Sequence, residues 1–379
     1  AFFDQNGNVY ESQDVVLDDK PETVVTYDGS KGPRAIFLNY QDEAFIKVRL
    51  DEFSINFFKE KLSSIQDELT KSMIWRALYD MVRDGMLSTY KFVQVAAENI
   101  CKEESETTLN NILYFSGIAT RNFAPKVLRD NYLYPMLFDE VLKALLATDK
   151  SKTNRVLMLK DNLIDFASVG PQRGIDNIAK LVAWIDGKDP QLKDFELTNE
   201  ERWNIVREIH RYEKLTDVQK KAYFLKVADI DSSDLMKRNE MACEAMLAKG
   251  ALREKGWKSF LDPENKTSLH MIGEAMSGYR RSPYYTESDE KLFFDSVTEV
   301  FKTRDAGFAK KFFNTLMPTG DNLAYYATRL EELKQNAKEL NNAQFIKAVG
   351  EAIDDNERAR KGYLCVANDL LSLFHGIHL

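Results

Sequence analysis

The chain has 379 residues and a formal net charge of −8, with 44% hydrophobic and 30% charged residues. These proportions are typical of a soluble globular protein and exclude an extensively disordered chain. The acidic balance, with a pI near 5.3, argues against a protein that binds nucleic acid through its phosphates. No apolar run reaches the ~20 residues that a membrane-spanning helix needs, so we expect no membrane partner.

The cysteines indicate the compartment of the protein, and the first residue indicates how the chain begins. Cys101, Cys243 and Cys365 are odd in number and far apart, which does not suit a disulfide framework. We therefore expect a reducing compartment, the cytoplasm. The chain begins with Ala1 and shows no signal-peptide pattern, so we expect it to begin within a longer gene product.

The first 50 residues show the pattern of β-strands. Four short segments, rich in Val, Ile, Phe and Tyr and separated by turn-forming dipeptides, cover residues 9–17, 23–29, 34–40 and 44–50. In the last segment Ile46, Val48 and Leu50 alternate with charged residues, which places the apolar side chains on one face. We predict an antiparallel β-sandwich remnant that packs partly on the following helices and whose partner sheet lies upstream.

From Asp51 onward the apolar residues follow the spacing of helices. Capping signals recur, such as the capping box formed by Thr198 and Glu201. We predict roughly fifteen or more helices of ordinary length, stacked in pairs as an irregular solenoid, and no strand after Leu50. The fold class is therefore mainly α, with a partial β-sandwich domain at 1–50 and an α-helical superhelical domain at 51–379.

The sequence lacks the motifs of common catalytic sites. It has four histidines, His210, His270, His375 and His378. None belongs to an H-E-x-x-H motif, and phosphate-binding and nucleophile-elbow motifs are also missing. His375 and His378 would need Asp369 or Cys365 as a further metal ligand, and we predict no metal site. The sequence alone indicates a scaffold without catalytic residues.

The segment GYRRSPYYTESDE, residues 278–290, is unusual for a scaffold. It places Arg280 and Arg281 beside Tyr284 and Tyr285 at a break between two predicted helices. Arginine forks and tyrosine hydroxyls in such a place suit the binding of a peptide backbone or a carboxylate. The same groups could instead tie two helix ends together through ion pairs. These four side chains are the candidate substrate-binding residues, and both interpretations stay open.

Five segments of the chain show recognisable motifs in a fixed order. They are IFLNYQDEAFIKVRLDE at 36–52, a segment at 69–88 that contains WRALYDMVRDG, and the segments 197–209, 243–262 and 293–318. The first segment resembles the passage from the β-sandwich into the helical domain of M1-family zinc aminopeptidases of the aminopeptidase N type. The second is similar to the W-x-x-L-x-D-M-V-R-x-G helix of that domain, and the other three are similar to its later helices, in the same order.

The resemblance implies a role for the chain within a larger enzyme. In this family a catalytic domain carries H-E-x-x-H and G-x-M-E-N, and a β-sandwich and an armadillo- or HEAT-like helical domain follow it. Residues 1–50 would be the tail of the sandwich, and 51–379 would wall and close the peptide chamber. No catalytic or zinc-binding residue of the family can be carried onto this chain. Zinc and the catalytic domain would therefore come from another part of the enzyme, which would release N-terminal amino acids from peptide substrates.

Alone, this chain should then be inactive. The alternative is a non-catalytic helical-repeat module that binds a protein partner along a concave face. An upstream reading frame that lacks H-E-x-x-H and G-x-M-E-N would favour that alternative.

Overall fold

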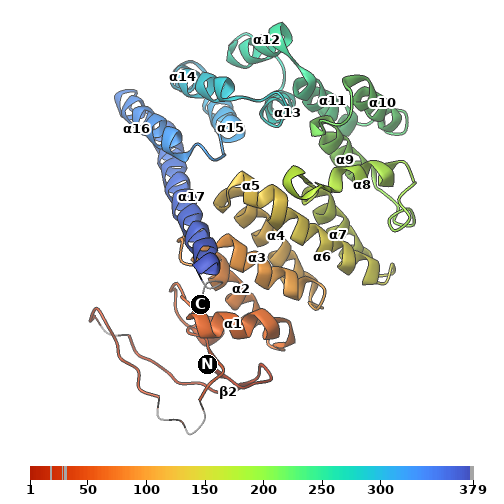
Figure 1. Cartoon of the computed structure of the whole chain (residues 1–379). Helices are drawn as coiled ribbons and strands as arrows, with labels where there is room; N and C mark the ends of the chain where they lie inside the picture. Colours follow the sequence, from red (N-terminus) through yellow and green to blue (C-terminus); the bar gives the residue numbers. More distant parts are fainter. Residues whose placement is uncertain (18, 28, 30–31, 376–379) are drawn as a thin grey trace. The chain divides into compact units, whose positions relative to one another are not determined.

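The computed structural model describes residues 1–17, 19–27, 29 and 32–375, with side chains to Leu371. Contacts divide the chain into two compact units. Unit 1 contains residues 1–124, 128–166 and the chain from Lys361 onward, and unit 2 contains residues 125–127 and 167–360. Helices dominate both units, which confirms the mainly-α fold class (Figure 1).

Unit 1 begins with a small antiparallel sheet. Its strands are β1 (Phe2–Phe3), β2 (Val9–Glu11) and β3 (Ala35–Ile36), in the spatial order β2-β1-β3. The turn after β1 contains Gly7 at φ +89°, a conformation that glycine adopts without strain. Phe3 is fully buried and packs edge-on against Phe58 of helix α1, with ring centroids 5.3 Å apart. The sheet therefore packs on the helices, as the sequence predicted in part.

Two of the predicted strands do not form. The described residues of 23–29 contain no strand, and neither does 44–50. Within 44–50 the Phe45 side chain is fully exposed and Ile46 is 44% exposed. A strand persists only where a neighbouring strand takes up its backbone hydrogen bonds, and these segments have no such neighbour among the described residues.

The helices of unit 1 stack in two layers. In chain order they are α1 (Glu52–Lys61), α2 (Glu68–Arg83), α3 (Thr89–Ile100), α4 (Glu106–Phe123), α6 (Tyr134–Ala147) and α7 (Thr153–Asp165), and a π-helical turn (Arg129–Leu133) precedes α6. The short α5 (Lys126–Leu128) begins in the segment 125–127, which belongs to unit 2. Helix α3 packs between α1 and α6, and α4 packs between α2 and α7. Further contacts of α3 with α4 and of α6 with α7 join the two layers.

Aromatic pairs hold these layers together. Trp75 of α2 meets Phe92 of α3 at 6.1 Å between ring centroids, and Tyr79 of α2 stacks on Phe115 of α4 at 4.5 Å. Helix α2 ends where the sequence predicts, because Gly85 adopts φ +70° directly after Asp84. These contacts fix the start of α3, which carries part of the pocket described below.

Unit 2 repeats the two-layer arrangement. Its helices are α8 (Asn177–Ile185), α9 (Asn199–Arg211), α10 (Asp217–Ala228), α11 (Asp234–Leu247), α12 (Gly250–Leu261), α13 (Leu269–Arg280), α14 (Glu287–Thr303), α15 (Ala306–Leu316), α16 (Leu323–Glu339) and the first part of α17 (Ala343–His375). Helices α9, α11, α13 and α15 pack in succession to form one layer (Figure 1). Helices α8, α10, α12 and α14 pack against that row.

Unit 2 also contains a feature that the sequence did not predict. Strands β4 (Val169–Gly170) and β5 (Ile175–Asp176) form a two-residue antiparallel hairpin, so the prediction of no strand after Leu50 is wrong. Their tip contains Gly174 at φ +67°. A hairpin this short gives no alternating pattern from which it could be recognised.

Capping and close packing set the helix positions in unit 2. The predicted capping box at α9 is present, with Thr198 N donating to Glu201 Oε2 at 2.7 Å and Glu201 N donating to Thr198 Oγ1 at 3.2 Å. Helices α11 and α13 approach each other at Gly278, where an added Cβ would lie 2.1 Å from the carbonyl oxygen of Ala242. This contact places the C-terminal end of α13, and so the Arg–Tyr segment, against α11.

Candidate functional site

The described residues contain no group of three or more His, Cys, Asp or Glu side chains that could hold a metal ion. A zinc ion therefore finds no fitting set of ligands in that part of the chain. The side chain of His375 and all of His378, which the sequence analysis considered together as a metal pair, lie outside the described residues. Among the described helices, none has the length and apolar character needed to cross a membrane.

One histidine and one cysteine, His210 and Cys243, are buried. His210 is 1% exposed, and its Nδ1 lies 2.8 Å from the carbonyl oxygen of Val206. Burial lowers the pKa of His210 to about 4, so the imidazole is neutral at pH 7. Cys243 is buried in the cluster around Trp203, and burial raises the pKa of its thiol to about 12. Neither group is suited to acid–base or nucleophilic catalysis at neutral pH.

The two candidate arginines lie at the C-terminal end of α13. The Arg280 guanidinium donates from Nη2 to the carbonyl oxygen of Thr319 at 2.9 Å and to its hydroxyl at 3.1 Å. It also lies over the ring of Tyr285, 4.4 Å from the ring centroid. Arg281 forms an ion pair with Glu208 of α9, which also pairs with Arg211 at 2.8 Å. Both guanidinium groups thus have partners from other segments of unit 2.

The two candidate tyrosines lie in the loop between α13 and α14. Tyr284 donates from its hydroxyl to Asp217 at 3.3 Å, and the Lys249 ammonium lies 4.3 Å from the centroid of its ring. The hydroxyl of Tyr285 is buried and has no hydrogen-bond partner. Burial raises the pKa of Tyr285, so its hydroxyl stays protonated. The structure therefore gathers all four predicted residues at one junction of α9, α10, α13 and α14.

A buried ion pair that the sequence analysis missed underlies this junction. Arg253 of α12 donates from Nε to Asp289 Oδ1 at 3.0 Å, and the Tyr279 hydroxyl donates to the same oxygen. The Arg253 guanidinium also stacks on the Tyr279 ring, 3.7 Å from its centroid. Asp289 Oδ2 accepts from the backbone N of Thr286 at 2.7 Å and so caps α14. One carboxylate therefore joins α12, α13 and α14.

The direction in which the pKa of Asp289 is shifted agrees with that geometry. Burial raises the pKa of Asp289, but the hydrogen bonds from Arg253 and Tyr279 outweigh burial and hold the pKa below its usual value of 3.8. Nearby, burial raises the pKa of Glu290 above its usual value, although Tyr326 donates to its Oε1 at 2.8 Å. Its second oxygen, Oε2, is buried without a partner. The carboxylate of Asp289 thus has hydrogen-bond donors at both oxygens, whereas the carboxylate of Glu290 has a donor at one oxygen only.

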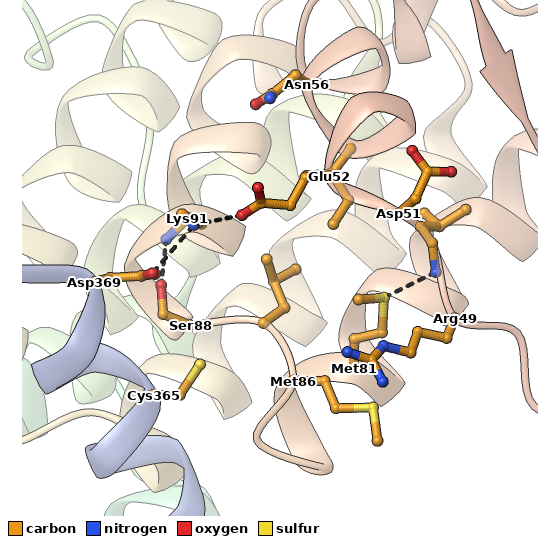
Figure 2. Close-up of a pocket in the computed structure, with 13 residues that line it drawn as sticks. Arg49, Asp51, Glu52, Asn56, Met81, Met86, Ser88, Lys91, Cys365 and Asp369 are labelled. Carbon is orange, nitrogen blue, oxygen red and sulfur yellow. Dashed lines mark hydrogen bonds and ion pairs between the residues drawn. The ribbon is translucent and has the colours of Figure 1, made fainter. Parts of the chain in front are cut away.

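Unit 1 carries a separate pocket, with a volume of about 740 Å³. Its walls come from the start of α1, the loop between α2 and α3, and the last part of α17, as Figure 2 shows. The floor consists of buried apolar side chains, Leu50, Ile55, Met81 and Leu87. Three segments that are far apart in the sequence therefore enclose one cavity.

Lys91 lies between two carboxylates, those of Glu52 and Asp369, on one wall of this pocket. Its ammonium lies 3.1 Å from Asp369 Oδ1 and 3.5 Å from Glu52 Oε1 (Figure 2). Burial lowers the pKa of Lys91, but the two carboxylates outweigh burial and raise it above the usual value. Ser88 caps α3 by accepting from the Lys91 backbone N at 3.2 Å. Lys91 therefore holds the ends of α1 and α17 against α3.

Little in the sequence could have revealed these two sites. Thr286 and Asp289 form a T-x-x-D pattern, which marks the helix start but not the ion pair with Arg253. Lys91 and Asp369 are separated by 278 positions (369 − 91), and neither stands in a motif. Both sites result from packing between helices that are remote in the chain.

Comparison with known proteins agrees with the fold and with the resemblance. Residues 35–358 match the ERAP1-like C-terminal domain family. Over 297 residues, or 76% of this chain and 33% of the relative, the sequence is 21% identical to Aminopeptidase N of Streptomyces lividans. The chain thus spans about a third of the length of that relative. The match covers most of the chain and confirms the predicted likeness to the C-terminal region of an aminopeptidase N: the chain belongs to the ERAP1-like C-terminal domain family.

Proposed function

We propose that this chain is the helical C-terminal part of a zinc aminopeptidase, in which it walls and closes the peptide chamber. The catalytic domain, which would hold the zinc ion, lies outside this chain, and the whole enzyme releases N-terminal amino acids from peptides. The observation that carries the proposal is the family match over residues 35–358. The absence of H-E-x-x-H and G-x-M-E-N from this sequence supports the proposal that the chemistry belongs to another part of the protein.

Exposed apolar side chains around helix α1 support the proposal that another part of the protein packs against that end of unit 1. Phe45 is fully exposed, and Leu38 and Phe53 are 55% and 58% exposed. The chain before Phe45 turns through Asn39 at φ 55° and Gln41 at φ 65°, conformations that cost non-glycine residues free energy. Exposed aromatic side chains on such a turn are suited to packing against another sheet. We propose that residues 1–50 belong to the β-sandwich that comes before the helical domain. Residues 51–379 would form the helical domain that closes over the catalytic domain.

The free cysteines support a proposal for the cellular location. Cys101, Cys243 and Cys365 are all free thiols. Burial raises the pKa of Cys101 to about 11, so its thiol stays protonated and unreactive at neutral pH. A protein with free, spaced cysteines is typical of a reducing compartment. We propose the cytoplasm.

The proposal is tested by expressing the complete reading frame that contains this chain beside the 379-residue chain alone. We expect the complete protein to carry H-E-x-x-H and G-x-M-E-N and to release N-terminal amino acids from peptides, with loss of activity in the presence of a zinc chelator. The chain alone should release none, because it has no fitting zinc ligands among its described residues. Chelator-sensitive release by the chain alone would contradict the proposal. A reading frame without both motifs would favour the non-catalytic interaction module.

The candidate substrate residues are tested in that complete enzyme by the double substitution of Arg280 and Arg281 with Ala. We expect KM for longer peptides to rise about tenfold, as for the loss of a charged hydrogen bond, and KM for single-residue chromogenic substrates to stay unchanged. Steady-state kinetics on both substrate types measure the difference. Arg238, an exposed arginine of α11 paired with Asp234, provides the matched Ala control. Equal effects on both substrate types would show that the arginine pair only ties helices together.

A further inference from the structure

We propose that unit 2 binds a small monovalent anion such as chloride beside the start of helix α10, held by the ammonium of Lys220. This site goes beyond the proposed function and does not rest on it. Lys220 belongs to the first part of α10, which packs on α9, and its side chain is only 2% exposed. A lysine is rarely buried so fully unless an opposite charge pairs with it.

No residue in the described part of the chain pairs with Lys220. No carboxylate there lies within ion-pair distance of its ammonium, and no acceptor lies within hydrogen-bond distance. The nearby carboxylate of Asp217 has other partners, because Oδ2 accepts from Lys249 at 2.7 Å and Oδ1 accepts from the Tyr284 hydroxyl at 3.3 Å. Glu213 is exposed, so water and salt screen its charge. The buried ammonium therefore lacks a counter-charge.

Three features near Lys220 favour an anion. The ammonium of Lys249 adds a second positive charge, close enough to act on the pKa of Lys220. The N-terminal end of α10 carries the positive end of the helix dipole. On α9, burial and then the charge of Lys220 lower the pKa of His210 to about 4, so this imidazole is neutral and offers no negative charge. An anion would relieve the repulsion among these positive groups.

The titration of Lys220 is consistent with an ammonium that has no partner. Burial lowers the pKa of Lys220, and the charge of Lys249 lowers it further. Asp217 and Glu213 act in the opposite direction without restoring the usual value. An anion in contact with the ammonium would stabilise the charged form and raise this pKa again.

The burial of Lys220 also limits which anion fits. A side chain that is 2% exposed leaves little room for an organic anion, whereas chloride is a single atom. One negative charge matches the one ammonium that lacks a partner. The bound anion would hold α10 in place beside Asp217, to which Tyr284 donates its hydrogen bond. The site thus links the salt composition around the protein to the position of one candidate substrate residue.

The experiment compares the 379-residue chain in sodium chloride and in sodium gluconate at equal ionic strength, so that general screening is the same in both. Chloride at tenfold above its Kd should raise the Tm of unit 2 by about 3–5 °C relative to gluconate, because it binds only the folded state. Chlorine NMR should show line broadening that saturates with Kd in the millimolar range. Equal Tm values in the two salts, or no saturable broadening, would overturn the proposal.

Substitutions assign the effect to this site. Lys220→Met removes the buried charge while nearly keeping the length of the side chain, and it should abolish both the Tm difference and the broadening. Lys221→Met, at the exposed neighbouring position, is the matched control and should change neither. Chloride binding that persists in Lys220→Met would place the anion elsewhere and overturn the proposal.

A second variant decides the matter if Lys220→Met does not fold. Lys249→Gln changes a side chain that is 51% exposed and leaves Lys220 buried. It removes one positive charge and leaves the Asp217 carboxylate without its ion-pair partner, so chloride should bind about tenfold more weakly. Unchanged chloride affinity in Lys249→Gln would contradict the proposed site.

Discussion

Asp289→Ala should lower the free energy of unfolding of unit 2 by about 3–5 kcal/mol, the cost of leaving one partner of a buried ion pair alone. Arg253 is 8% exposed and Asp289 is 6% exposed, so water cannot replace the lost contact. The substitution also removes the acceptor for Tyr279 and the side-chain cap of α14. Three helices would lose their common polar contact at once. Denaturant unfolding followed by fluorescence and circular dichroism measures the loss.

A matched variant and the pH dependence make this expectation specific. Asp295→Ala removes a 46% exposed carboxylate from the same helix, where it pairs with Arg329, and should cost less than about 1 kcal/mol. The pKa of Asp289 is lower in the folded protein than its ordinary value of 3.8, so its stabilising contribution is complete above that value. It is lost as the pH falls through the folded pKa. The difference between the native chain and Asp289→Ala should therefore shrink in strong acid, and equal losses for both variants would contradict the role of the buried pair.

Gly278→Ala should destabilise unit 2 by about 2 kcal/mol, although alanine is the better helix former. The gain in helix propensity is about 1 kcal/mol, whereas overpacking costs typically 1–3 kcal/mol and more where the backbone must move. The new Cβ would lie 2.1 Å from the carbonyl oxygen of Ala242 and 2.8 Å from its Cα. These are backbone atoms of α11 and cannot rotate away. Helices α11 and α13 would have to separate, which also displaces Arg280 and Arg281.

Gly256→Ala provides the control with the opposite sign. Gly256 lies inside α12 with open space where its Cβ would be, so alanine should raise the stability of unit 2 by roughly 0.5–1 kcal/mol. Thermal unfolding of both variants under identical conditions tests the pair. Similar shifts of Tm in the same direction would show that close helix packing at Gly278 is not what requires glycine there.

For the Arg–Tyr segment, the sequence identified the residues but not their surroundings. Arg280, Arg281, Tyr284 and Tyr285 were recognised because they cluster within six positions. Their partners are Glu208 of α9, Asp217 of α10 and Thr319 in the loop after α15. The sequence of the segment does not indicate any of these partners. Whether these arginines face substrate in a complete enzyme stays a prediction.

The sequence by itself determined the mainly-α fold class, the helix starts marked by capping residues such as Thr198, and the likeness to aminopeptidase N. It could do so because helical periodicity and capping depend on residues a few positions apart. Only the tertiary structure decided which of the first 50 residues form strands, where Arg253 meets Asp289, and that Arg49, Lys91 and Asp369 share one pocket. Those outcomes depend on side chains brought together from distant segments, and on whether a neighbouring strand exists to accept backbone hydrogen bonds.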